Sequence, residues 1–201
     1  MSPRRPRSNP LALAILACLR EKPMHPYEMA VTMRERAKHE SIRLNYGSLY
    51  SVVEALERDG LIEAQETVRD GRRPERTIYR LTEPGLEEFA DWLTDLLRTP
   101  AKEYPQFEAG LSLLAGLPPD DVVGLLEERC ERLEASLAEQ RATLSGALAD
   151  GLPRLFLVEL EYAIAMRDAE LAYTRALTGE IASGALGGVE LWRGLHAPEP
   201  Q

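Results

Sequence analysis

The sequence predicts a mostly α-helical protein with two parts. The first is a small N-terminal domain of three helices and a two-stranded β-hairpin, and the second is an all-helical C-terminal domain. Apolar residues recur every three or four positions as far as Gly60, which indicates helices. The pattern then changes to β-branched and aromatic residues around an Asp-Gly turn, and it returns to helical spacing after Thr82.

Prolines separate the first two helices. The apolar residues of the first helix lie on one face: Leu11, Ile15, Cys18 and Leu19. Pro23 ends this helix, and Pro26 suits the first turn of the second, where no backbone N–H is needed. We expect His25 to cap or pack at this helix start, and we expect Cys18 to be a core residue.

The third helix is short and amphipathic. Asn45 is a favourable N-cap, and Gly60 provides a left-handed C-terminal stop. Its apolar face consists of Leu49, Val52, Val53 and Leu56. The opposite face carries hydrogen-bonding groups, which a helix needs to read a DNA groove. The residues expected to face DNA are Asn45, Tyr46, Ser48, Tyr50 and Ser51. Tyr50 has the alternative role of a half-buried ring that braces the helix.

Two strands are expected at 61–68 and 76–82, joined by a turn at Asp70-Gly71. Four arginines surround this turn: Arg69, Arg72, Arg73 and Arg76. Three helices followed by such a hairpin are the layout of a winged helix-turn-helix domain. The arginines can reach phosphates or a minor groove, and the alternative is a solvated turn.

The charge is distributed unevenly, although the net charge of the chain is -9. Residues 1–82 contain 15 basic and 11 acidic residues, whereas residues 83–201 contain 9 and 22. This asymmetry indicates that only the N-terminal part meets phosphates. The tract 1–10 is expected to be flexible, and Arg4, Arg5 and Arg7 make it a candidate DNA-binding arm or simply a solvated tail.

A linking helix is expected to follow Thr82, with Trp92 on its flank. Its core face is expected to consist of Leu86, Phe89, Leu93 and Leu97. Prolines at 100 and 105 mark the boundary between the domains. We therefore expect domains at 11–98 and 105–183 and a weakly ordered tail at 184–201.

The C-terminal half carries a heptad pattern, which is typical of helix–helix seams. It runs along one long helix through Leu126, Cys130, Leu133, Leu137, Gln140 and Leu144. A final helix is expected at 153–182. Together they predict a dimer interface made of Leu126, Cys130, Leu133, Leu137, Leu144, Leu160 and Ile164. The alternative is that the two helices pack only on each other within one chain.

Aromatic and sulfur-containing side chains suggest a site for a small apolar or aromatic ligand. The candidates are Trp92, Tyr162, Met166 and Tyr173. Such residues at helical spacing are also common in ordinary cores. No cofactor or metal site is expected, because the three histidines are scattered.

Residues 11–98 resemble the DNA-binding domain of the PadR family of transcriptional regulators. The resemblance rests on MHPYE at 24–28, GSLYSVVEALERDGLI at 47–62 and GRRPERTIYRLTEPG at 71–85. Pro26 and Ser51 depart from the usual family residues, which are glycine and proline. The helical remainder is similar to the larger C-terminal domain of one family branch. The resemblance implies a dimeric regulator, often a repressor, that loses DNA affinity when a small apolar or aromatic molecule binds.

A dimer would present two reader helices to half-sites about 34 Å apart, which implies a palindromic operator in double-stranded DNA. The alternative function is a winged-helix module for protein–protein interaction through the acidic half. An enzyme is disfavoured, because no motif for a nucleophile, phosphate loop or metal appears. No apolar run spans a membrane, and a cytoplasmic location is expected.

Overall fold

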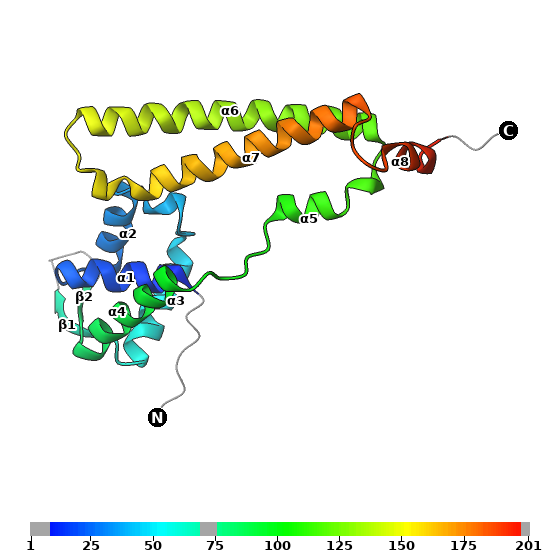
Figure 1. The fold of residues 1–201 in the computed structure, drawn as a ribbon. Coiled ribbons are helices and arrows are strands. Elements are labelled where there is room, and N and C mark those ends of the chain that lie inside the picture. Colours follow the sequence, from blue (N-terminus) through cyan, green and yellow to red (C-terminus); the bar gives the residue numbers. More distant parts are fainter. Residues whose placement is uncertain (1–8, 69–75, 198–201) are drawn as a thin grey trace. The chain divides into compact units, whose positions relative to one another are not determined.

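The computed structural model describes residues 9–68 and 76–197. The chain divides into two compact units, Met1–Lys102 and Glu103–Gln201 (Figure 1). The mostly helical fold class with a two-stranded antiparallel sheet is confirmed. None of the helices in the described part of the chain is both long and apolar enough to span a bilayer.

The described part of the first unit has the predicted order of elements. They are α1 (Pro10–Glu21), α2 (Pro26–Glu35), a short 3-10 turn (Lys38–Glu40), α3 (Tyr46–Arg58), β1 (Ile62–Val68), β2 (Arg76–Leu81) and α4 (Glu83–Arg98). His25 caps α2, because its Nδ1 accepts from the Tyr27 N–H and its own N–H donates to Glu28. The expected capping role of His25 is confirmed.

The core of the first unit forms around α1, which packs against α2, α3, α4 and β2. The apolar faces predicted for α1 and α3 are buried in this one cluster. Cys18 belongs to it, and burial raises the pKa of its thiol, as for the free Cys130 of the second unit. Both thiols therefore stay protonated at neutral pH, as expected of core residues.

Hydrogen bonds and close packing hold the base of the hairpin against the helices. β1 and β2 pair antiparallel with Ile62 opposite Leu81, and Tyr79 also pairs with Met24 between α1 and α2. At the start of α4, the Thr82 hydroxyl donates to the Gly60 carbonyl at 2.8 Å. Gly85 lies so close to β1 that a Cβ there would overlap the Leu61 carbonyl oxygen.

The core face predicted for α4 is right at Phe89, which packs against the core, and wrong at Leu86, Leu93 and Leu97. Trp92 is 4% exposed and lies in the core, whereas Leu97 is 81% exposed, and Leu86 and Leu93 are exposed too. Gly85, Phe89 and Trp92 share the inner face, because glycine lets the helix approach β1 and the indole fills the space below. The expected flank position of Trp92 is therefore also wrong.

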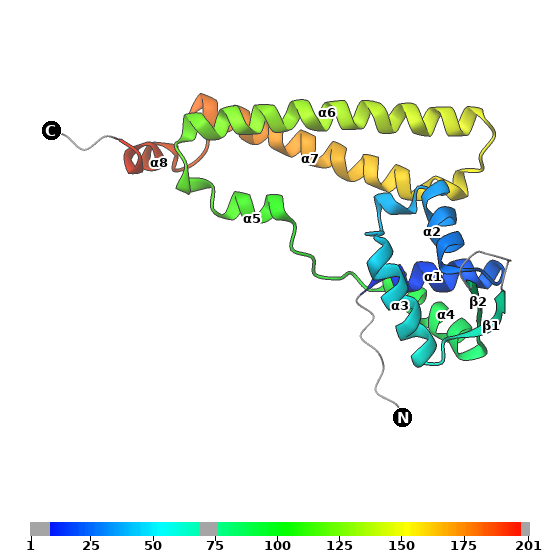
Figure 2. The same cartoon turned by 180° about the vertical axis from the view of Figure 1, so that it is seen from behind.

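The described part of the second unit is helical throughout. Its elements are α5 (Gln106–Ser112), a 3-10 turn (Leu114–Gly116), α6 (Pro119–Ala149), a second 3-10 turn (Arg154–Phe156), α7 (Val158–Ser183) and α8 (Val189–Leu195). α6 and α7 form a long antiparallel hairpin, which both views show (Figures 1 and 2). The Arg129–Glu170 and Arg141–Asp168 ion pairs bridge the two helices.

The heptad seam joins α6 to α7 inside one chain. The buried residues Cys130, Leu137, Ile164 and Leu171 form one cluster, flanked by Leu133, Leu144 and Leu160. Leu126 lies in a neighbouring cluster with α8 residues. Packing on α7 of the same chain is what the alternative expected, and a role of these residues in a dimer interface stays a prediction.

The expected weakly ordered tail is wrong as far as residue 197. Residues 189–195 form α8, and its Trp192 is buried against Val122, Leu126 and Ile181. The indole N–H donates to the Leu117 carbonyl at 2.8 Å. Tertiary packing thus outweighs the local signal of the glycines at 184, 187 and 188.

Candidate nucleic-acid interface

Helix α3 is held by its apolar face and its N-cap. Leu49, Val53 and Leu56 are buried against α1 and α2. The Ser48 N–H donates to Asn45 Oδ1 at 3.0 Å, so the predicted N-cap is confirmed. These two anchors fix the rotation of the helix about its axis, and the polar face must therefore point away from the core.

The polar face of α3 offers several hydrogen-bonding groups to a partner. Tyr50 is 44% exposed and lies outside the core cluster, so DNA contact and bracing of the helix both stay predictions for this ring. Ser51 is exposed and its hydroxyl donates to the Ser48 carbonyl at 3.0 Å, which leaves its oxygen lone pairs to accept. The Asn45 side-chain oxygen accepts the capping hydrogen bond, and its NH₂ group is left to donate to a ligand. The Tyr46 side chain lies outside the described residues, although its backbone begins α3.

The hairpin is fixed next to α3 by its second strand. The Tyr79 hydroxyl donates to Glu57 of α3 at 3.4 Å. Burial and the neighbouring Glu57 carboxylate raise the pKa of Tyr79, so the phenol remains a neutral donor. The Tyr79 N–H and carbonyl also pair with Met24 at 3.0 and 3.1 Å. The base of the hairpin is therefore tied to the same frame that holds α3.

The cationic residues predicted on the hairpin tip and the arm fall outside the described residues. This applies to Arg4, Arg5, Arg7, Arg69, Arg72 and Arg73. Arg76 begins β2, but its side chain is not described either. Their roles stay predictions.

Sequence reasoning missed Arg43. This arginine is exposed two residues before the N-cap Asn45 and forms no ion pair within the described residues. The first turn of α3 contains no acidic side chain. The positive end of the helix dipole and this cation therefore add to each other at the N-terminus of α3. A basic residue just before a cap asparagine was the signal available in the sequence.

The candidate ligand residues belong to two different units. Trp92 is buried in the first unit, whereas the other three lie on α7 of the second. Tyr162, Met166 and Tyr173 are 68%, 52% and 57% exposed. Their spacing of four and seven residues places them on one face of α7. This group is an exposed apolar stripe and not part of the unit's core.

Comparisons with known proteins agree with this architecture. A family model described as "Transcriptional regulator PadR-like family" matches residues 15–91. The curated "Negative transcriptional regulator PadR" of Bacillus subtilis is 24% identical over 152 residues, covering 73% of this chain and 79% of that protein.

Two solved structures of Bacillus subtilis PadR show the same fold. The complex with operator DNA has a TM-score of 0.71 at 20% identity, over 90% of this chain and 99% of that one. The complex with p-coumaric acid has a TM-score of 0.67 at 17% identity, over the same shares of the two chains.

Proposed function

We propose that this chain, whose residues 15–91 match the PadR-like family of transcriptional regulators, is a dimeric, sequence-specific DNA-binding repressor released by a small apolar or aromatic ligand. The observation that carries the DNA-binding proposal is the polar face of α3. It is presented to solvent by a buried opposite face and by the Asn45 cap. Hydroxyl and amide groups on such a helix can bond to phosphates and base edges in a major groove.

The charge distribution also supports contact between the polar face of α3 and DNA. Arg43 and the positive end of α3 lie at one edge of the polar face. The predicted arginines of the hairpin, Arg69, Arg72, Arg73 and Arg76, would add further phosphate contacts. Phosphate contacts supply affinity for any sequence, and base contacts from Ser48 or Tyr50 would supply the preference for one operator.

Dimerisation is part of the proposal, because a single reader helix makes too few contacts for tight binding. The seam residues are used inside the chain. A second copy would therefore use apolar side chains that stay exposed on the second unit, such as Tyr162, Met166 and Tyr173 of α7. Light scattering of the full chain tests this step, with a dimer expected and a stable 22.5 kDa monomer contradicting it.

The proposals of repression and of release by a ligand rest on the relatives. The curated relative is named a negative regulator, and one structural neighbour is a complex with p-coumaric acid. By this likeness, the ligand proposed for the chain is a small aromatic or apolar molecule that lowers the affinity for DNA.

Ser48→Ala tests the role of the α3 face. Fluorescence anisotropy with the DNA upstream of its own gene and with random DNA of equal length gives the two affinities. We expect Ser48→Ala to weaken upstream binding by about tenfold and random binding by less than twofold. The matched control is Ser145→Ala on the exposed side of α6, which should change neither. Equal losses of affinity for both DNAs would show that the α3 face contacts the DNA backbone and does not read the bases.

The hairpin arginines are tested by the salt dependence of binding. Replacing Arg72 and Arg73 together with glutamine should weaken binding to all DNA alike. The slope of log K against log salt concentration should fall by up to about 2 per subunit, since each phosphate contact contributes about 0.9. An unchanged slope would exclude these two residues from the interface.

A further inference from the structure

A groove on the second unit combines apolar and cationic walls. Its volume is about 380 Å³, and α5, α6 and α7 line it. Its apolar wall includes Phe107, Leu125 and Leu133, and the charged side chains that line it are Glu128, Arg129, Arg132 and Arg167. A groove of this size that offers both charged and apolar groups can hold a small organic ligand.

Two of the three guanidinium groups in the groove are already neutralised. Arg129 Nε donates to Glu170 Oε1 at 2.7 Å, and its guanidinium carbon lies 3.7 Å from the centre of the Phe107 ring. Arg132 pairs with Glu128 one turn earlier on α6 at 3.1 Å. The Arg129–Glu170 pair joins α6 to α7, and the contact of the Arg129 guanidinium with the Phe107 ring joins α5 to α6.

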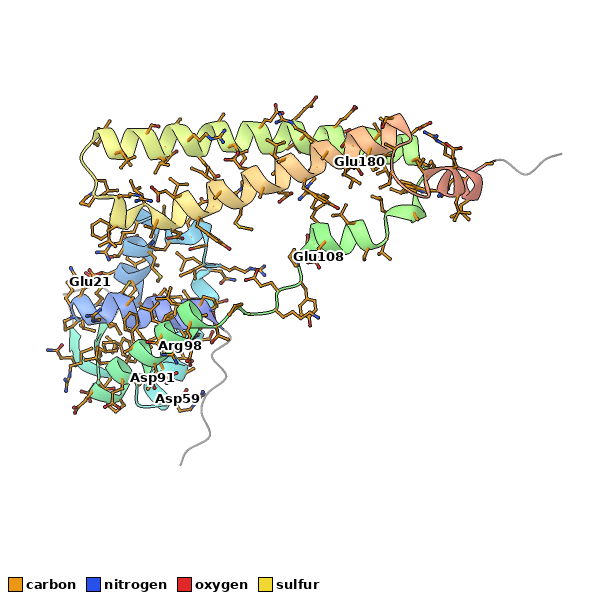
Figure 3. The ribbon with its side chains drawn as sticks, in the orientation of Figure 1. Glu21, Asp59, Asp91, Arg98, Glu108 and Glu180 are labelled. Carbon is orange, nitrogen blue, oxygen red and sulfur yellow. The ribbon has the colours of Figure 1, made fainter. Side chains whose placement is uncertain are left out.

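Arg167 is different from its neighbours. It is half-buried in the groove and forms no hydrogen bond or ion pair within residues 9–68 and 76–197. The Ser136 hydroxyl, also half-buried in the groove, has no hydrogen-bond partner in the same described ranges. A partly desolvated cation without a counter-ion is costly, and an anionic group would remove that cost. Glu108 of α5, labelled in Figure 3, lines neither this groove nor the cavity beside it and does not supply that group.

An apolar cavity adjoins the groove. Its volume is about 170 Å³, and it shares Phe107, Leu125 and Leu126 with the groove. The rest of its wall consists of glycine, valine and leucine side chains. Phe107 therefore borders both the groove that contains Arg167 and a cavity lined by apolar residues.

We propose that this groove binds a small apolar monocarboxylate. The carboxylate pairs with the Arg167 guanidinium and accepts from the Ser136 hydroxyl. The apolar tail lies on Phe107 and Leu125 and extends into the leucine-lined cavity. Burial of the tail supplies affinity, and the carboxylate supplies the preference for an anion over a neutral molecule of the same shape.

Calorimetry on the full-length protein without DNA tests this site. The probe is sodium octanoate, and 1-octanol is the neutral comparison of equal chain length. We expect octanoate to bind at least about tenfold more tightly than 1-octanol. Arg167→Gln should remove that advantage and leave 1-octanol binding unchanged. The control is Arg98→Gln at the end of α4 in the first unit, labelled in Figure 3, which should change neither affinity.

Leu125→Asn checks the apolar part of the site. Leu125 is largely exposed, so the substitution spares the core, and it should weaken octanoate and 1-octanol alike. The proposal is overturned if Arg167→Gln leaves octanoate affinity within about twofold of the original. It is also overturned if octanoate and 1-octanol bind equally, or if octanoate fails to bind. Because binding is measured without DNA, these outcomes stand whether or not the chain recognises an operator.

Discussion

Replacing Gly85 with alanine should break the junction between the hairpin and α4. A Cβ at this position would overlap the Leu61 carbonyl oxygen and lie 2.9 Å from its carbonyl carbon and 2.8 Å from Leu81 Cδ1. Two of these atoms belong to the backbone, so rotation of a side chain cannot relieve the overlap. The start of α4 must therefore move away from β1.

The cost of that movement follows from the contacts it breaks. The Thr82 N–H donates to the Leu61 carbonyl at 3.2 Å, and the Thr82 hydroxyl donates to the Gly60 carbonyl at 2.8 Å. Losing both bonds costs about 2 kcal/mol, and the disturbed packing of Leu81 adds about 1 kcal/mol. We expect Gly85→Ala to lower the free energy of unfolding of the first unit by about 3 kcal/mol.

Tryptophan fluorescence can follow each unit separately during urea unfolding. The chain has two tryptophans, and in a Trp192→Phe background only Trp92 remains, in the core of the first unit. Gly146→Ala on the exposed side of α6 is the matched control, because no atom lies near the added methyl group. It should leave the Trp92 transition unchanged. A Gly85→Ala transition within about 1 kcal/mol of the parent would refute the reasoning.

Three further predictions concern α3, the hairpin and the α6–α7 seam. Asn45→Ala removes the acceptor for the Ser48 N–H and should destabilise the first unit by about 1 kcal/mol in the same urea assay. An unchanged urea midpoint would contradict the capping role. The raised pKa of Tyr79 means that its contribution to stability is present below pH 10.0, the unperturbed value, and is lost as the pH rises through the higher folded value. Unfolding of the first unit should therefore show a steeper loss of stability above pH 10.0 than in Tyr79→Phe, and equal slopes would count against this shift. Gln140 Oε1 is buried without a hydrogen-bond partner in the described residues. Gln140→Leu should therefore raise the free energy of unfolding of the second unit by about 1–2 kcal/mol. Trp192 fluorescence in a Trp92→Phe background measures this change. A loss of stability would show that this oxygen is satisfied.

The first unit was largely predictable, because its signals are local. The N-cap Asn45, the stop at Gly60 and the apolar face of α3 each depend on a few neighbouring residues, and the structure contains all three. The exposed polar face of α3 followed from the same pattern. The rotation of α4 did not, because it depends on the approach of Gly85 to Leu61, a contact across 24 residues of the sequence.

The second unit shows the limits of a pattern. The heptad repeat correctly indicated a helix–helix seam, but a repeat does not specify whether the partner helix belongs to the same chain. The structure supplies α7 as that partner, held by ion pairs such as Arg141–Asp168. The tail was misjudged because its glycines are a local signal, whereas Trp192 is stabilised by the distant Leu117 and Leu126.

The groove at Arg167 could not be predicted from the sequence either. Phe107, Arg132 and Arg167 come from three helices, and no spacing within one helix indicates that they line one space. The Arg129–Glu170 pair forms only once α6 lies beside α7, whereas the Arg132–Glu128 pair follows from i,i+4 spacing within α6.

Site-specific crosslinking tests the central claim, that the polar face of α3 lies against duplex DNA. Ser51→Cys on α3 and Ser145→Cys on α6 place matched exposed thiols at the two positions, while the native Cys18 and Cys130 stay buried. Each variant is labelled with a photoactivatable aryl azide and irradiated with the DNA upstream of its own gene. We expect a covalent adduct from position 51 that unlabelled upstream DNA suppresses, and none from position 145. Equal yields from the two positions, or no adduct from position 51 while the labelled protein still binds, would contradict the account.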